Sequence, residues 1–298
     1  MKTLAVVLNT RAGRARGLPR TDMRAVLQTA APWADIAVYD ASRDIVGAAR
    51  AACASGADAV AVAGGDGTAG AVLDAARSAG CASVMVPLPL GTANMLPRRL
   101  YGERDFHAVL GELPGYRPVT LHAGAAAGRT FYVALMAGAP ARFGQAREAL
   151  RPEERGRRLG EAARRARQGL SAMAGSRLRP TLEGAQQKVS RSGAVIVTPG
   201  GFSALRGLEA PPGPAVLEHL IVRPADPADL ALKTASFLTG LPDPAEAALA
   251  SKGPSTLSGP KQIHLMLDGE VCKVDGPVRI GLVENAACFA APDPEARG

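Results

Sequence analysis

Short apolar runs alternate with helical patterns along the first third of the chain. Four runs have the length of buried strands, and three intervening stretches space their apolar residues as one face of a helix does. The predicted strands are Leu4–Leu8, Ile36–Tyr39, Ala59–Ala63 and Ser83–Val86, and the predicted helices are Thr21–Ala30, Asp44–Ser55 and Ala69–Ala79. Strands and helices in regular turn predict an α/β domain with a parallel sheet covered on both faces.

The pattern changes near Pro114–Pro118, after which short β-rich runs dominate. Proline and glycine turns separate several of them. The predicted strands are Val119–His122, Thr130–Met136, Ala194–Thr198, Val216–Val222, Ile263–Leu267, Val278–Val283 and Ala286–Ala290. We therefore expect a second, mostly antiparallel domain with one helical insertion near residues 152–174.

Positive charge is concentrated in one segment of the chain. The net charge is +8, and the segment from Arg142 to Arg179 holds eleven arginines against four glutamates. Within it, Glu153–Ala174 has the pattern of an amphipathic basic helix. Such a helix either docks on anionic lipid or exposes a solvated basic face while its apolar stripe packs on the second domain. Nucleic-acid binding is not expected, because aromatic residues make up only 4% of the chain and no recognition motif accompanies the charge.

The cysteines, the histidines and the length of the apolar runs argue against a disulfide-linked, zinc-binding, secreted or membrane-spanning protein. The cysteines form no C-x-x-C pair, which is typical of reduced, mostly buried thiols in a cytosolic protein. No signal peptide is recognisable, and no run approaches the roughly 20 apolar residues of a transmembrane helix. The histidines lack metal-ligand spacing and are expected to be structural. Ser203 has no histidine nearby in sequence, so it is not expected to be a catalytic nucleophile. The cysteines and histidines are Cys53, Cys81, Cys272, Cys288, His107, His122, His219 and His264.

The most informative residues are Gly64-Gly65-Asp66-Gly67-Thr68, between a predicted strand and a predicted helix. Glycines let the backbone approach a ligand closely, and the free N–H groups of a helix start favour phosphate. Thr68 is predicted to cap the helix. A carboxylate at Asp66 would lie beside those phosphates, where Mg²⁺ would make it tolerable. The alternative is a glycine-rich turn with a solvated aspartate.

A second loop, Pro87–Asn94, directly follows the fourth predicted strand. Asn9 and Gly13 follow the first strand in the same way. Because the carboxyl ends of parallel strands meet at one edge of a sheet, we expect the three loops to converge on one ligand-binding crevice.

With these motifs the chain resembles the diacylglycerol kinase catalytic-domain family, which includes bacterial lipid kinases, sphingosine kinases and ceramide kinases. The matching stretches are Asn9 to Gly13, Gly64–Thr68, Pro89–Asn94 and Leu267–Glu270, the last of which carries the family's Asp-Gly-Glu motif. The glycine pentapeptide alone is shared with NAD kinases. The Gly-Thr-x-Asn loop and the Asp-Gly-Glu make the resemblance specific, and it spans nearly the whole chain.

The resemblance implies an N-terminal nucleotide-binding domain over residues 1–117 and a C-terminal, lipid-binding β-sandwich over residues 118–298, with the active site in a cleft between them. The last strand can return to the first domain. The implied activity is that of a lipid kinase that uses ATP and Mg²⁺ to phosphorylate the hydroxyl of a diacylglycerol-like or ceramide or sphingoid lipid.

Site residues follow from the resemblance and from the second loop. Glu270 is the implied general base, Asp66 is expected to act in catalysis, and Asp66 and Asp268 are expected to hold Mg²⁺. Asp268-Gly269 is also a strong hairpin-turn signal, and the turn and the catalytic interpretation are compatible. The expected nucleotide contacts are Asn9, Gly64, Gly65, Asp66, Gly67, Thr68, Gly91, Thr92 and Asn94.

Three departures from the family pattern leave alternatives open. Met95 stands where many relatives have aspartate, an aspartate near Thr120 is absent, and Pro212-Gly213-Pro214 replaces an Asp-Gly, with Glu218 further on. A catalytically weak adaptor that binds nucleotide or lipid at the membrane is therefore one alternative. An NAD kinase-like enzyme is the other alternative, because NAD kinases share the glycine pentapeptide.

The implied partners are a lipid substrate and, transiently, an anionic membrane surface. The expected location is cytoplasmic, peripheral at the inner face of the membrane. Oligomeric state stays open, with a homodimer as one compatible state.

Overall fold

A computed structural model of the chain describes residues 1–11, 20–138, 141, 178–183, 192, 194–201, 213–222, 248–251 and 253–293. The predicted basic helix, Gly13 and Ser203 lie outside these residues. The chain divides into two compact units. Unit 1 holds Met1–His122 and the chain from Glu284 onward, and unit 2 holds most of Ala123–Val283. The boundary predicted at residue 117 falls at the start of β5 (Arg117–Ala126), a strand that runs from unit 1 into unit 2.

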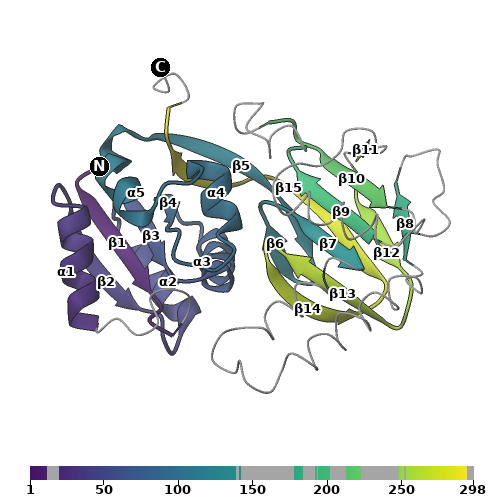
Figure 1. Ribbon diagram of the computed structural model, residues 1–298, viewed down its shortest axis with the longest axis horizontal. Helices are drawn as coiled ribbons and strands as arrows, with labels where there is room; N and C mark the ends of the chain where they lie inside the picture. The colour runs from purple at the N-terminus through teal and green to yellow at the C-terminus, as the bar shows by residue number, and fades with distance from the viewer. Residues whose placement is uncertain are drawn as a thin grey trace. The chain divides into compact units, whose positions relative to one another are not determined.

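Unit 1 is built on a parallel sheet with strand order β2-β1-β3-β4, and the end of β15 (Val278–Ala291) pairs beside β4 (Figure 1). Its strands are β1 (Thr3–Leu8), β2 (Asp35–Asp40), β3 (Ala59–Ala63) and β4 (Val84–Pro87), and its helices are α1 (Arg20–Ala30), α2 (Ile45–Ala54), α3 (Asp66–Ser78), α4 (Met95–Tyr101) and α5 (Phe106–Glu112), followed by the short 3-10 helix η2 (Leu113–Gly115). Residues of β3 are buried throughout, as expected for a parallel strand covered on both faces.

Side-chain caps explain where two of these helices begin. The carboxylate of Asp44 accepts the N–H of Gly47 at 2.9 Å before α2, and that of Asp105 accepts the N–H of Ala108 at 2.9 Å before α5. Each satisfies a backbone donor that has no partner inside its helix. The sequence pattern did not predict α4 and α5, because both are only seven residues long and Pro97 lies inside α4.

Unit 2 contains two sheets that face each other across an apolar core (Figure 1). One sheet is antiparallel with strand order β11-β10-β9-β7-β13-β14, and the opposing layer contains β6, β8, β12, the end of β5 and the first part of β15. The strands are β6 (Arg129–Phe131), β7 (Leu135–Gly138), β8 (Arg179–Leu182), β9 (Ala194–Pro199), β10 (Leu217–Val222), β11 (Ala248–Ser251), β12 (Ser255–Ser258), β13 (Gln262–Leu267) and β14 (Glu270–Asp275). The predicted α/β class with a mostly antiparallel second domain is confirmed.

Two strand predictions after residue 117 are wrong. The single strand predicted over Thr130–Met136 is broken at Tyr132–Ala134, whose amides bond a carboxylate instead of a neighbouring strand. The two strands predicted at the end of the chain are one, because β15 continues through Asn285 with that residue at a φ of 48°. The four-residue strands β8, β11 and β12 were not predicted.

Glycine at position 124 is required by the ring that packs on it. Gly124 of β5 lies opposite Phe131 of β6, and a Cβ at position 124 would overlap the fully buried Phe131 ring. We expect Gly124→Ala to lower the free energy of unfolding by about 1–3 kcal/mol, because the added methyl overpacks the core. Denaturant titration measures this loss. Gly281→Ala is the matched control, since a Cβ on Gly281 meets nothing within 4 Å; equal losses in the two variants would contradict the packing explanation.

Candidate functional site

The glycine turn joins β3 to α3 without a side-chain cap. Gly65 is the N-cap residue in extended conformation, no side chain caps the helix, and α3 starts at Asp66. The first backbone N–H groups of α3 therefore have neither an intrahelical acceptor nor a side-chain cap, the arrangement that binds anions at helix starts. The prediction that Thr68 caps the helix is wrong, because the helix begins two residues before it. The residues predicted as a loop after the two glycines are the first turn of the helix itself.

Thr68 instead links α3 to the end of β1. The side-chain amide of Asn9 donates to the Thr68 hydroxyl at 2.9 Å, and both residues are buried. The backbone N–H of Asn9 donates to the Ala63 carbonyl at 2.9 Å. Gly64 is needed beside this pair, because a Cβ there would lie 2.8 Å from the Thr68 Cβ. The two predicted loops after β1 and β3 are thus joined by buried hydrogen bonds.

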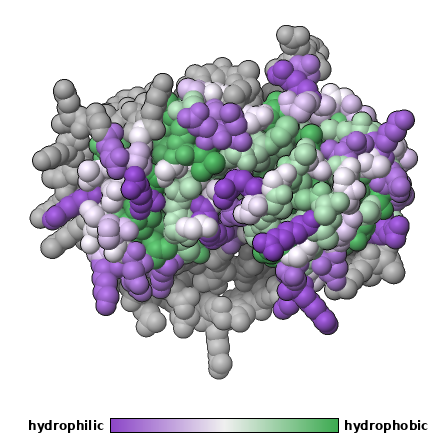
Figure 2. All heavy atoms as spheres, turned by 180° about the vertical axis from the view of Figure 1, so that it is seen from behind, coloured by the Kyte–Doolittle hydropathy of each residue, from purple (hydrophilic) through white to green (hydrophobic). Residues whose placement is uncertain are grey.

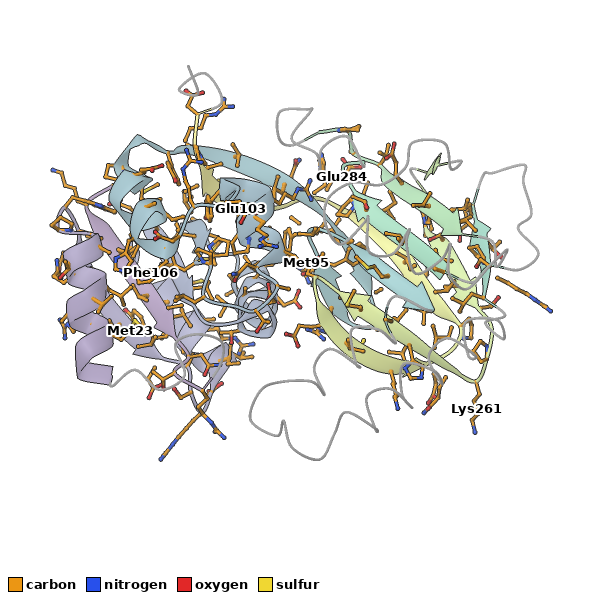
Figure 3. The ribbon with its side chains drawn as sticks, viewed as in Figure 1. Met23, Met95, Glu103, Phe106, Lys261 and Glu284 are labelled. Atoms are coloured by element: carbon orange, nitrogen blue, oxygen red, sulfur yellow. The ribbon has the colours of Figure 1, made fainter. Side chains whose placement is uncertain are left out.

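Asp66 links α3 to the loop after β4. Its Oδ2 accepts the N–H groups of Ala93 and Asn94, each at 3.2 Å, and its Oδ1 accepts that of Met95 at 3.1 Å. Met95, labelled in Figure 3, is the first residue of α4. A single carboxylate therefore holds three consecutive backbone amides where α4 begins.

Gly91 and Asn94 complete the same contact. The Gly91 N–H donates to the Asn94 Oδ1 at 2.6 Å, and Asn94 has a φ of 50°. A Cβ on Gly91 would lie 2.7 Å from Asp66 Oδ2 and 2.9 Å from Asn94 Oδ1, so only glycine fits. Thr92, between them, is exposed. Hydrogen bonds among Asn9, Thr68, Asp66 and this loop bring the predicted nucleotide residues of unit 1 together at one edge of the sheet.

The Asp-Gly-Glu residues form a hairpin in unit 2. Asp268 and Gly269 are the two turn residues between β13 and β14, with φ values of 46° and 91°. Positive φ at both positions is characteristic of a type I′ turn, for which Asp-Gly is favoured. Glu270 is the first residue of β14, opposite Leu267, and is half-buried. The turn is confirmed, and the roles predicted for Glu270 and Asp268, with the cleft in which they would act, stay predictions.

Tyr132, Val133 and Ala134 donate their backbone N–H groups to Asp268 at 2.6, 2.8 and 2.9 Å. Sequence reasoning missed this segment. Its apolar side chains predict a strand. Every residue except proline has a backbone N–H, so residue type does not show which N–H groups bind a carboxylate. The only available sign was the motif aspartate itself.

The side chains near the glycine turn determine whether it can take part in binding a metal ion. Within the described parts of the chain, no three or more His, Cys, Asp or Glu side chains gather closely enough to hold a metal ion. A carboxylate has about four acceptor positions, and the three amides on Asp66 leave room for one more, such as a metal-bound water. Asp66 can therefore contribute to a Mg²⁺ site whose remaining ligands are water and phosphate oxygens, a common arrangement for this ion.

Two of the four histidines make contacts between strands. His219 Nε2 lies 2.8 Å from the Ser255 hydroxyl, with both residues buried inside unit 2, and His122 Nδ1 accepts the N–H of Asn285 at 3.1 Å. Each of these contacts joins two strands. They agree with the prediction that the histidines are structural.

All four cysteines are free, and each is half-buried rather than buried as predicted. Burial, and after it the neighbouring Cys81 thiol, raise the pKa of the Cys53 thiol to about 12. Burial likewise raises the pKa of Cys272 and of Cys288. A raised pKa keeps these three thiols protonated near neutral pH, where they are poor nucleophiles.

Comparison with known proteins finds a family model that matches the part of the chain holding the glycine turn and the second loop. Residues 3–123 match the model of the diacylglycerol kinase catalytic domain. No curated protein sequence matches the chain. The family match includes Asn9, Asp66 and Gly91 and stops before Asp268.

Solved structures match the fold of the whole chain. A diacylglycerol kinase from Bacillus anthracis str. Sterne aligns with a TM-score of 0.66 at 17% identity, over 99% of this chain and 98% of that one. Two further structures from the same strain, each with a provisional diacylglycerol kinase name, align with TM-scores of 0.64 at 17% and 18% identity and the same coverage. At these identities the likeness establishes the fold.

The buried Asn9–Thr68 hydrogen bond can be tested by its contribution to stability. We expect Thr68→Val to lower the free energy of unfolding by about 1–3 kcal/mol, because the buried Asn9 amide loses its acceptor. Urea titration measures the loss. Thr92→Val, at an exposed position of the second loop, should change stability by less than about 0.5 kcal/mol. A Thr68→Val variant as stable as Thr92→Val would show that the bond does not hold β1 to α3.

Proposed function

We propose that this chain, which carries a diacylglycerol kinase catalytic domain over residues 3–123, transfers the γ-phosphoryl group of ATP to the hydroxyl of a diacylglycerol-like or ceramide or sphingoid lipid. The observation that supports this most strongly is the uncapped start of α3 after Gly64-Gly65, joined by Asp66 to the Gly91–Asn94 loop. Free amides and two glycine-containing loops suit phosphate groups.

Each predicted nucleotide-binding residue of unit 1 has a role in binding ATP. The amides of Gly65, Asp66, Gly67 and Thr68 donate to phosphate oxygens at the positive end of the α3 dipole. Asn9 fixes Thr68 from β1, and Gly64 and Gly91 leave space where side chains would collide. Asp66 keeps the second loop, with Thr92 and Asn94, beside the phosphates.

Glu270 is the proposed general base. The lipid oxygen forms a bond to the γ-phosphorus while the bond from that phosphorus to the β,γ-bridging oxygen breaks, and ADP leaves. The hydroxyl proton passes to the Glu270 carboxylate and then to water, which a half-buried side chain can reach. Bound Mg²⁺ would neutralise charge on the phosphate groups. Asp66 would hold the ion through water.

The acceptor lipid is reached at a membrane surface. No helix in the described part of the chain is long and apolar enough to cross a membrane. Figure 2 shows hydrophilic side chains interspersed with apolar ones on one face. Among the described residues the large hydrophobic side chains that are exposed are Met1 and Val46. We propose transient, peripheral binding to anionic lipid from the cytoplasmic side, for which the arginine-rich segment supplies the charge.

A substrate screen tests the proposed activity. Purified protein is incubated with γ-labelled ATP, Mg²⁺ and each of diacylglycerol, ceramide, sphingosine and a prenol in mixed micelles, with NAD as a further acceptor. Label should enter one of the lipids and not NAD. Label in NAD alone would establish the NAD kinase alternative, and ATP binding without any transfer would establish the adaptor.

Replacement of the proposed base separates chemistry from binding. Glu270→Gln should lower kcat by about 10²–10⁴-fold, because the amide cannot accept the proton, while the affinity for ATP is unchanged. Steady-state kinetics and calorimetric titration with ATP measure the two quantities. Glu103→Gln, at a side chain 85% exposed on the surface of unit 1, should leave both unchanged. Full activity in Glu270→Gln would rule out this residue as the base.

A further inference from the structure

Asp268 accepts shorter backbone hydrogen bonds than Asp66 does. It accepts three consecutive backbone N–H groups, from Tyr132, Val133 and Ala134, at 2.6–2.9 Å. Those three donor residues are buried. The corresponding bonds at Asp66 are longer, at 3.1–3.2 Å. Asp268 therefore has a specific structural partner, the segment between β6 and β7.

A fourth bond makes the contact reciprocal. The N–H of Asp268 donates to the Ala134 carbonyl at 3.0 Å. The turn residues Asp268 and Gly269 both have positive φ, which leaves a tight turn with little freedom. Glu270 follows at once as the first residue of β14. The place of the Glu270 backbone is thus set by the bonds that Asp268 makes two residues earlier.

We propose that Asp268 is a positioning residue, which holds the hairpin turn against Tyr132–Ala134 and so fixes Glu270, and that it is not a metal ligand. This inference rests on the proposed function, since it assumes that Glu270 is the base. Three converging N–H groups form a concavity with positive potential, which suits the carboxylate and opposes a cation at the same oxygens. The bonds at Asp268 are also shorter than those at Asp66, so the backbone amides compensate more of its negative charge and make it the poorer metal ligand of the two.

Asparagine in place of Asp268 tests the carboxylate itself. The substitution Asp268→Asn keeps the size of the side chain and its tolerance of positive φ. In the orientation that keeps the bonds to Val133 and Ala134, the new NH₂ group would face the N–H of Tyr132, so two donors would oppose each other. Asp268→Asn should therefore loosen the turn without preventing the unit from folding. Asp275→Asn, at an exposed position at the other end of β14, is the matched control.

Kinetics should separate positioning from metal binding. In Asp268→Asn we expect kcat to fall about 10- to 100-fold through misplacement of the base, with KM for ATP and the half-saturating Mg²⁺ concentration unchanged. In a Glu270→Gln background the same substitution should cost almost nothing more, because the group it positions is already inactive. Asp275→Asn should behave as the unchanged chain does.

Three results would overturn the inference. Activity restored by high Mg²⁺ would make Asp268 a metal ligand. A full additional loss in the Glu270→Gln background would show that Asp268 acts independently of Glu270. Amide hydrogen exchange at Tyr132–Ala134 that is unchanged in Asp268→Asn would show that the turn is not held there. Amide exchange needs no turnover, so it tests whether Asp268 holds the turn even if the unchanged chain transfers no phosphate. Absence of phosphate transfer would refute the proposed function, and the positioning role of Asp268 with it.

Discussion

The carboxylate of Asp66 ties the start of α3 to the start of α4, and the proposed nucleotide site depends on that tie. The Asp66 side chain lies at the first position of a helix that has no side-chain cap. It accepts the amides of Ala93, Asn94 and Met95 from a loop that follows a different strand. Without this acceptor the three N–H groups would have only water to bond, and the loop would no longer be held beside the glycine turn. One side chain thus holds two loops that are distant in sequence together at the same edge of the sheet.

Unit 2 uses the same chemistry for a different purpose. Asp268 also binds three consecutive amides, but the donors belong to an interruption between two strands and the acceptor belongs to a hairpin turn. Backbone amides are good partners here because their positions are fixed by the fold, whereas a long basic side chain would have to be ordered first. In both units an aspartate that resembles a metal ligand in sequence also organises the backbone around it.

The sequence predicted the fold more completely than the site. The strands of unit 1 and the helix over Asp44–Ser55 were recovered within a residue or two, because buried apolar runs and a capping aspartate give local signals. The Asp-Gly turn was recovered for the same reason. The position of Thr68 inside α3 was not predicted, since two glycines before it suggested a longer loop. The bonds from Asp66 and Asp268 were not predicted either, because their donors are backbone atoms of residues such as Ala93 and Val133, whose side chains carry no sign of the contact. The required glycine at position 91 becomes understandable only once the oxygens of Asp66 and Asn94 are seen beside it.

The most direct test of the account is to measure ATP binding and amide exchange in Asp66→Asn, both with Mg²⁺ and with EDTA. If Asp66 joins the two loops, the variant loses exchange protection at Ala93, Asn94 and Met95 and binds ATP more weakly even in EDTA. Unchanged protection, with weaker binding only in the presence of Mg²⁺, would contradict it and leave Asp66 with a metal-binding role alone.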